Sequence, residues 1–248
     1  SHFSWMTVVA AMGQMFYSLS IAMGILYTYG SYTRKEMDLE KSTTQVEIFD
    51  TAIAILAGLM IIPAVFAFSG GDASNLQAGP SLMFITLPKV FASMGIGTVA
   101  GILFFVLVLL AALTSAVSLM ETSVSTFMDE LHWSRRKSCF LMAVIMLVLG
   151  TASSMGYGLL DFIKIFGMSF LDFFDFMTNS VMMPLAALAT CILVTKVIGF
   201  DKIIKEIESS SAFKRKKLYV FCIKYLAPVC LIIILLSSIA NVLGIISM

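Results

Sequence analysis

The sequence predicts an all-α, polytopic membrane protein, on three observations. Of the 248 residues, 59% are hydrophobic and 12% are charged, whereas soluble domains average roughly half apolar and a quarter charged. The apolar residues form six long runs, and a helix needs about 20 such residues to cross a bilayer. The loops between the runs alternate between basic and nearly uncharged. A formal net charge of +1 gives no basis for binding nucleic acid.

The six predicted spans follow one another as a single transmembrane domain over residues 1–248, and the fourth is the shortest. Their approximate ranges are 3–32, 46–68, 98–128, 139–154, 170–200 and 218–248. With no initiator methionine and a span beginning almost at once, the chain is expected to be a fragment of a longer protein.

Basic residues gather in three of the five loops, 33–45, 129–138 and 201–217, while the other two carry only Lys89 and Lys164. Basic loops stay on the cytoplasmic side of a membrane. We therefore expect these three loops in the cytoplasm, both chain ends outside, and the protein in the cell's inner (plasma) membrane. The alternation independently agrees with six spans.

The first span contains small and polar residues near its middle, where a lipid-facing helix would carry Leu or Ile. Ser18, Ser20, Ala22 and Gly24 fall within seven positions. Serine competes with the backbone for hydrogen bonds and glycine is a poor helix former. This pattern predicts a helix broken at mid-membrane, with freed backbone groups lining a cavity. A continuous helix, packed closely against a neighbour through its small residues, is the alternative.

The loop of about 69–97, predicted to be extracellular, is long and contains several glycines and prolines. Its first part is polar and its second part amphipathic. A long structured loop is often a lid over a site. The alternative is a surface loop with a short helix lying on the membrane.

Several acidic residues fall within predicted spans, where ionisable groups are costly and indicate a functional site. Asp50 near the start of the second span would bind or neutralise a cation, or simply reach solvent at the cytoplasmic interface. Glu121 would serve transport chemistry or a structural hydrogen bond. Asp172 and Asp175, three apart on one helix face, would form a charged gate or a solvated helix start.

The third span carries a stripe of small and polar residues at spacings of three and four. Its members are Ala111, Thr114, Ser115, Ser118, Thr122 and Ser125. Such spacing puts them on one helix face. Thr114 and Ser115, beside a freed carbonyl, suit a hard monovalent cation. A tight helix–helix seam explains the same pattern.

Four groups of residues stand out, in order along nearly the whole chain: residues 13–20 with 29–32, residues 49–51 with 57–58 and 63–66, residues 79–84 with 86–88, and residues 111–115. Together they resemble the neurotransmitter:sodium symporters, in particular their bacterial amino-acid transporter branch with the LeuT-type fold. The resemblance implies family helices six to eleven of a larger inverted-repeat bundle, the first of them broken, with five helices absent.

The resemblance also assigns residues to two sodium sites, each completed by the absent N-terminal helices. Ser18 and Asp50 match the first site. The second site matches the Ala111 carbonyl and the hydroxyls of Thr114 and Ser115. Because some relatives have Asn at the position of Asp50, its fixed charge is expected to make chloride unnecessary.

The substrate pocket and the outer gate are assigned in the same way. The pocket residues are Tyr17, Ser18, Ser20, Ala22, Met23, Ser115 and Leu119, and the gate residues are Tyr17, Asp172 and Asp175. Ala22 stands where a glycine is common, and its methyl is expected to disfavour the bulkiest substrates.

We therefore expect sodium-coupled symport of a neutral, hydrophobic amino acid by alternating access, as part of a longer chain in a lipid bilayer. No span offers a nucleophile–base pair, a metal cluster or a phosphate loop, so an enzyme is not expected. A transporter-like amino-acid receptor or regulatory subunit, a proton-coupled permease on the same fold and a purely structural bundle are the alternatives. A homodimer is left open.

Overall fold

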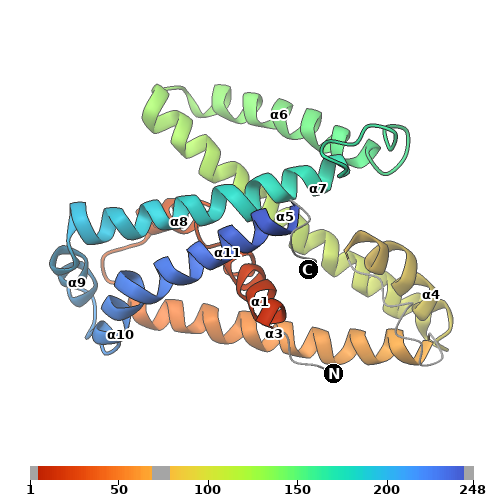
Figure 1. The fold of residues 1–248 in the computed structure, drawn as a ribbon, viewed down its shortest axis with the longest axis horizontal. Helices are drawn as coiled ribbons and strands as arrows, with labels where there is room; N and C mark the ends of the chain where they lie inside the picture. Colours follow the sequence, from red (N-terminus) through yellow and green to blue (C-terminus); the bar gives the residue numbers. More distant parts are fainter. Residues whose placement is uncertain (1–4, 69–78, 243–248) are drawn as a thin grey trace. The chain divides into compact units, whose positions relative to one another are not determined.

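A computed structural model of the chain describes residues 5–68 and 79–242 (Figure 1). These residues are almost entirely helical, as predicted. Within the described ranges, extended backbone pairs only at an isolated bridge between Ile165 and Met168.

The chain divides into two compact units, which are described separately. The first unit comprises Ser1–Thr44 and Leu119–Met248, and the second comprises Gln45–Ser118. Two helices, α3 (Leu39–Phe68) and α5 (Gly97–Leu131), each contribute to both units. The prediction of a single transmembrane domain stays a prediction.

The first unit contains most of the helices (Figure 1). Its N-terminal part holds α1 (Trp5–Ser18) and α2 (Ile25–Tyr32), and α6 (Arg135–Met155) follows α5. The next span is α7 (Phe170–Asp175), the π-helical η3 (Phe176–Met182), α8 (Met183–Ile192) and the π-helical η4 (Leu193–Ile198). After α9 (Phe200–Glu208), the last span is α10 (Lys216–Phe221), the π-helical η5 (Cys222–Leu226) and α11 (Ala227–Val242).

Within the described residues, five continuous helical segments are long and apolar enough to cross a membrane, which makes the chain a multi-pass membrane protein. They are Leu39–Phe68, Gly97–Leu131, Arg135–Met155, Phe170–Ile198 and Lys216–Ala240. The first predicted span is absent from this set because the chain between Trp5 and Tyr32 is divided into α1 and α2, neither of which is long enough alone.

Three helices extend beyond the predicted spans into the loops. α3 begins at Leu39, seven residues before the predicted span, α5 ends at Leu131, and α6 begins at Arg135. Hydropathy locates where a helix leaves the apolar layer, whereas the helix itself continues into water where charged residues keep good helix propensity. Of the predicted spans and the predicted lid loop, residues 3–4, 69–78 and 243–248 lie outside the described residues.

The core of the first unit lies between α8 and α11, which run side by side in Figure 1. Ala187 and Cys191 of α8 pack with Leu231 of α11 in a buried cluster, and Phe16 of α1 packs against it. The end of α1 is thus held against the last two spans.

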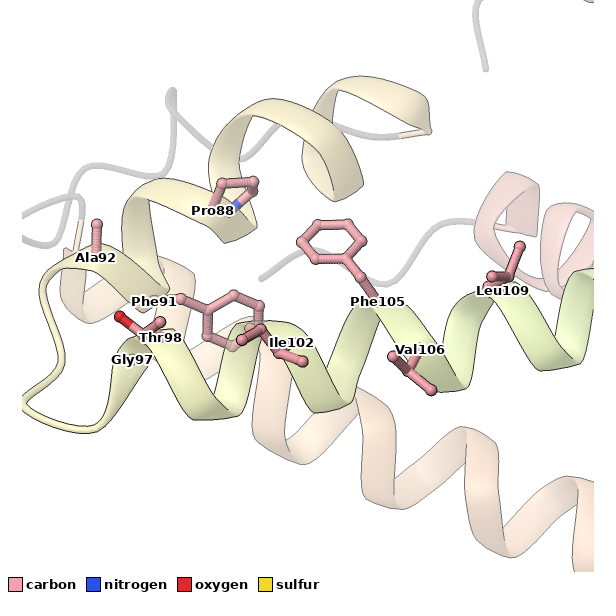
Figure 2. Close-up of a pocket in the computed structure, with 10 residues that line it drawn as sticks. Pro88, Phe91, Ala92, Gly97, Thr98, Ile102, Phe105, Val106 and Leu109 are labelled. Atoms are coloured by element: carbon pink, nitrogen blue, oxygen red, sulfur yellow. The ribbon is translucent and has the colours of Figure 1, made fainter.

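The second unit packs α3 and α5 around a short π-helical segment, η2 (Leu82–Thr86), and α4 (Leu87–Ala92). Val65 of α3 forms a buried cluster with Leu87 and Val90 of α4. A side chain at Gly97 would meet the Phe91 carbonyl at 1.5 Å, so glycine permits the close turn from α4 into α5. The described part of the predicted lid loop thus packs against α3 and α5 within this unit (Figure 2), and its role as a lid stays a prediction.

Candidate functional site

The first predicted span is broken between α1 and α2, which confirms the broken-helix prediction over the continuous one. The N–H of Ser20 donates to the Tyr17 carbonyl at 3.0 Å, and the N–H of Ile21 donates to the Phe16 carbonyl at 3.0 Å. With Ser20 at φ 54°, these two bonds form the Schellman motif that ends many helices. Glycine normally occupies the position that Ser20 has here, so the backbone of Ser20 is strained where α1 ends.

Two further left-handed residues carry the chain from this stop to the start of α2. Ala22 has φ 62° and Gly24 has φ 80°. A left-handed conformation is unfavourable for an L-residue with a side chain by about 1–2 kcal/mol. Packing offsets this cost at Ala22, because its side chain lies against the cluster formed by α8 and α11. The first N–H groups of α2 have no partner within their own helix, and such groups favour an anion or carboxylate.

α2 lies close against the C-terminal half of α5. A Cβ atom added at Gly24 would stand 2.7 Å from the Cγ2 atom of Thr122. One turn further, the hydroxyls of Thr28 and Ser125 are 3.4 Å apart. The polar stripe therefore acts at Thr122 and Ser125 as the tight seam that was the alternative to a cation site.

A carboxylate on α5 joins three helices beside this seam. Glu121 accepts a hydrogen bond from the hydroxyl of Tyr32 on α2 at 2.9 Å. Both of its oxygens accept from the guanidinium of Arg135 on α6, at 3.0 and 2.5 Å. Fork-shaped pairing of this kind is strong and directional. Glu121 thus has the structural bonding role that was one of its two predicted roles.

The N-terminal half of the stripe, in the second unit, is arranged differently. The hydroxyl of Thr114 donates to the Ala111 carbonyl at 2.9 Å, and the side chains of Ala111, Thr114 and Ser115 are exposed. Two oxygens this close can contact one cation together, and hydroxyl and carbonyl oxygens suit a hard cation. The donor set therefore fits sodium, although the assignment of the site stays a prediction.

Asp50 lies well inside α3 rather than near its start. The helix begins at Leu39, so Asp50 is about 16 Å along it at 1.5 Å per residue. Its side chain is half-buried. Because α3 extends beyond the predicted span at this end, its start does not give the depth of Asp50 in a membrane, and both predicted roles of Asp50 stay predictions.

The two gate carboxylates have different local partners. Asp172 accepts a hydrogen bond from the Ser169 hydroxyl at 2.6 Å and donates its N–H to that hydroxyl at 3.2 Å. This reciprocal arrangement caps the start of α7. Asp175 instead accepts from the Asn179 side chain one turn later. Asp172 therefore has the helix-start role, and the gate role of both residues stays a prediction.

The remaining predicted residues fall into both units. Tyr17, Ser18, Ser20, Ala22 and Met23 lie at the end of α1 and in the break, and Leu119 also belongs to the first unit. Asp50, Ala111, Thr114 and Ser115 belong to the second. The members of the predicted first sodium site and of the predicted substrate pocket are thus divided between the two units, and both sites stay predictions.

Sequence reasoning missed the contacts of Tyr27, Tyr32 and Arg135. Tyr27 donates its hydroxyl to Thr190 of α8 at 2.8 Å. Tyr27 and Tyr32 are five positions apart on α2, which gives no simple facial pattern. Arg135 was counted only as a topological charge, although a basic residue following a span that contains an unpaired carboxylate is a usable signal for an ion pair.

Comparison with known proteins decides the family. The model of the sodium:neurotransmitter symporter family matches residues 4–245. The chain belongs to this family. It is 32% identical to an uncharacterised sodium-dependent transporter of Bacillus subtilis, over 99% of this chain and 54% of the relative. It is 33% identical to an uncharacterised sodium-dependent transporter of Haemophilus influenzae, over 93% of this chain and 50% of that protein.

A solved structure gives the same answer for the fold. The crystal structure of MhsT in complex with L-phenylalanine matches with a TM-score of 0.83 and 37% identity, over 93% of this chain and 51% of MhsT. The predicted LeuT-type fold is thereby confirmed. The family is one of transporters and not of enzymes. The chain spans about half the length of the relatives it matches.

Proposed function

We propose that this chain forms half of a sodium-coupled symporter for a neutral, hydrophobic amino acid. The observation that carries the proposal is the break between α1 and α2, with left-handed backbone at Ser20, Ala22 and Gly24. An interrupted helix inside a membrane exposes backbone groups that must face a cavity, a ligand or other protein. A purely structural bundle has no use for such a break.

Sodium coupling is supported by the oxygen pair on α5. The Thr114 hydroxyl and the Ala111 carbonyl lie 2.9 Å apart on an exposed face. We assign these atoms and the Ser115 hydroxyl to one sodium ion, and Ser18 and Asp50 to a second. Bound sodium would supply positive charge at these oxygens. Segments absent from this chain would complete both sites.

The substrate assignment follows from the chemistry of the break. The amide groups at the start of α2 favour a carboxylate, and Met23 and Leu119 offer apolar contacts for a side chain. MhsT was crystallised with L-phenylalanine, so a hydrophobic amino acid is the substrate class we propose. We assign Tyr17, Ser18, Ser20, Ala22 and Ser115 to the same pocket.

Alternating access requires helices that hold one arrangement until ligands change the balance. A ligand shifts a conformational equilibrium only by its different affinity for the two states. The contacts of α2 with Thr122, Ser125 and Glu121 are suited to hold one such state. We propose that Tyr17, Asp172 and Asp175 close the opposite, extracellular side.

Two further parts of the proposal concern the anion and the membrane. A fixed charge at Asp50 replaces a bound chloride, so transport would not need chloride. We propose that the protein resides in the plasma membrane with loops 33–45, 129–138 and 201–217 in the cytoplasm.

The test is uptake by the full-length protein reconstituted in liposomes. An inward sodium gradient should drive accumulation of labelled L-phenylalanine, with chloride replaced by gluconate making little difference. The full-length Asp50→Asn variant should lose uptake or acquire a requirement for chloride.

Three results would contradict the proposal. Uptake that follows a proton gradient and ignores sodium would favour a permease. Sodium-dependent binding without flux would favour a receptor or regulatory subunit. A structural bundle would be favoured if the protein binds no neutral amino acid while a thermal unfolding measurement shows that it is folded.

A further inference from the structure

The loop between α6 and α7 presents apolar side chains outward. Leu159 is 78% exposed, Phe162 is 79% exposed and Phe166 is 85% exposed. These are large side chains that a water-exposed loop seldom carries together. We refer to residues 156–169 as the 156–169 loop.

The polar groups of this loop are largely paired within it. The N–H groups of Gly158 and Leu160 donate to the Met155 carbonyl at 2.9 Å each, and Ile165 and Met168 exchange two bonds of 3.0 Å. Its two charged side chains, Asp161 and Lys164, form an ion pair with each other. The cost of moving a segment out of water falls when its polar groups already have partners.

The tip of the loop carries an aromatic residue in a conformation that suits other residue types. Phe166 has φ 52° and Gly167 has φ 78°, between the two residues of the bridge. Such a two-residue turn with two left-handed positions favours Asn or Gly first and Gly second. Phe166 stacks with Phe173 at 6.3 Å between ring centroids, yet the rest of its ring is exposed. Strain retained at an exposed position indicates a use for the side chain there.

We propose that the 156–169 loop is an interfacial membrane anchor, whose residues Leu159, Phe162 and Phe166 insert into the leaflet opposite the basic loops. The loop leaves one span at Met155 and enters the next at Phe170, so both of its ends lie at a membrane surface. Aromatic side chains favour the membrane–water interface. The internal Asp161–Lys164 pair leaves no net charge with which to select a charged protein partner.

The anchor has a consequence for the span that follows it. The loop joins directly to Ser169, whose hydroxyl caps α7 through Asp172. Insertion of Phe162 and Phe166 would fix the depth at which α7 begins. Asp172 and Asp175 lie three and six residues after Ser169, so their depth would be fixed as well. The inference concerns membrane contact and holds whether or not the protein transports amino acids.

The test uses the full-length protein in phosphatidylcholine–phosphatidylglycerol vesicles, with Phe162→Trp as a fluorescent reporter and the parent emission subtracted. Lipids brominated near the headgroup should lower the reporter's emission about twofold, whereas aqueous acrylamide should have little effect. Adding Phe166→Asn, which suits the turn but removes the ring, should reduce the lipid quenching about twofold, and Phe166→Leu should preserve it.

Two results would overturn the proposal. Quenching by acrylamide without quenching by brominated lipid would place the loop in water. Quenching by neither would show that other protein covers it, either the rest of the full chain or a second copy. If Phe162→Trp protein does not fold, Leu159→Trp serves as the reporter with the same expected results.

Discussion

The two ends of the polar stripe on α5 use the same residue types in different ways. At Thr122 and Ser125 the stripe is covered by α2, within contact distance of Gly24 and Thr28. At Ala111, Thr114 and Ser115 the stripe is exposed, and the Thr114 hydroxyl bonds to its own helix. A spacing of three and four therefore shows that residues share a face, while the partner of each part of that face decides its role. The covered end should govern stability, and the exposed end should govern sodium dependence.

The largest effect on stability is expected from Gly24→Ala. The new Cβ would meet Thr122 Cγ2 at 2.7 Å, and φ 80° is unfavourable for alanine, so we expect a loss of about 2–4 kcal/mol. Thermal unfolding of the full-length protein in detergent measures the loss. Thr122→Ser, which removes only the clashing methyl, should restore part of it. An unchanged unfolding temperature for Gly24→Ala would show that the covered end is not tightly packed.

A smaller effect is expected from the carboxylate beside the seam. Glu121→Gln keeps an acceptor for Tyr32 but loses the ion pair with Arg135, whose side chain is 58% exposed. We expect a loss of about 1 kcal/mol, because solvent screens the guanidinium. Comparing both single variants with the Glu121→Gln, Arg135→Gln pair gives the coupling energy. A coupling near zero would contradict a stabilising role for this contact.

Ala22→Gly should change stability very little, because opposing contributions nearly cancel. Relief of the left-handed strain at φ 62° is worth about 1–2 kcal/mol, against about 0.8 kcal/mol for the lost methyl and about 0.5–1 kcal/mol for glycine's backbone entropy. The net change should be within about 0.5 kcal/mol of zero. The same variant should bind L-tryptophan better relative to L-alanine in competition assays. A lower relative affinity for L-tryptophan would remove Ala22 from the pocket.

The smallest effect is expected outside both ends of the stripe, at Asp38 before α3. The Lys41 backbone N–H donates to the Asp38 carboxylate at 2.9 Å and holds the pKa of Asp38 below its ordinary value. A lowered pKa in the folded state stabilises the protein above the unfolded-state pKa of about 3.8, and this stabilisation is lost as the pH falls through the folded value. Unfolding between pH 3 and 6 should therefore be slightly less pH-dependent in Asp38→Asn. Identical profiles would remove this contribution.

The sequence predicted those features that depend on composition and local geometry. Small residues at Ser18, Ser20, Ala22 and Gly24 predicted the break, because they stand where a lipid-facing helix would carry Leu or Ile, and serine and glycine weaken a helix. The apolar runs predicted the remaining spans. The start of α3 at Leu39 was missed because hydropathy does not detect a helix continuing into water.

Features that depend on distant contacts could not be predicted in this way. The bonds from Tyr32 and Arg135 to Glu121 join residues 89 and 14 positions apart, and periodicity within one helix does not identify such partners. The cap at the start of α7 could have been predicted, since Ser169 stands three residues before Asp172. For the π-helical segments η3, η4 and η5 we find no sequence signal.

The central claim is that the exposed end of the stripe binds sodium and the covered end does not. The most direct measurement is binding of labelled L-phenylalanine to the full-length protein across a sodium titration. Thr114→Ala with Ser115→Ala should raise the sodium concentration for half-maximal binding by at least about 100-fold, since two lost oxygen ligands together cost about 3–6 kcal/mol. Ser123→Ala with Thr126→Ala is the matched control, because those hydroxyls bond to carbonyls of their own helix, and it should leave the midpoint unchanged. A parental midpoint in the Thr114, Ser115 variant, with folding intact, would contradict the account.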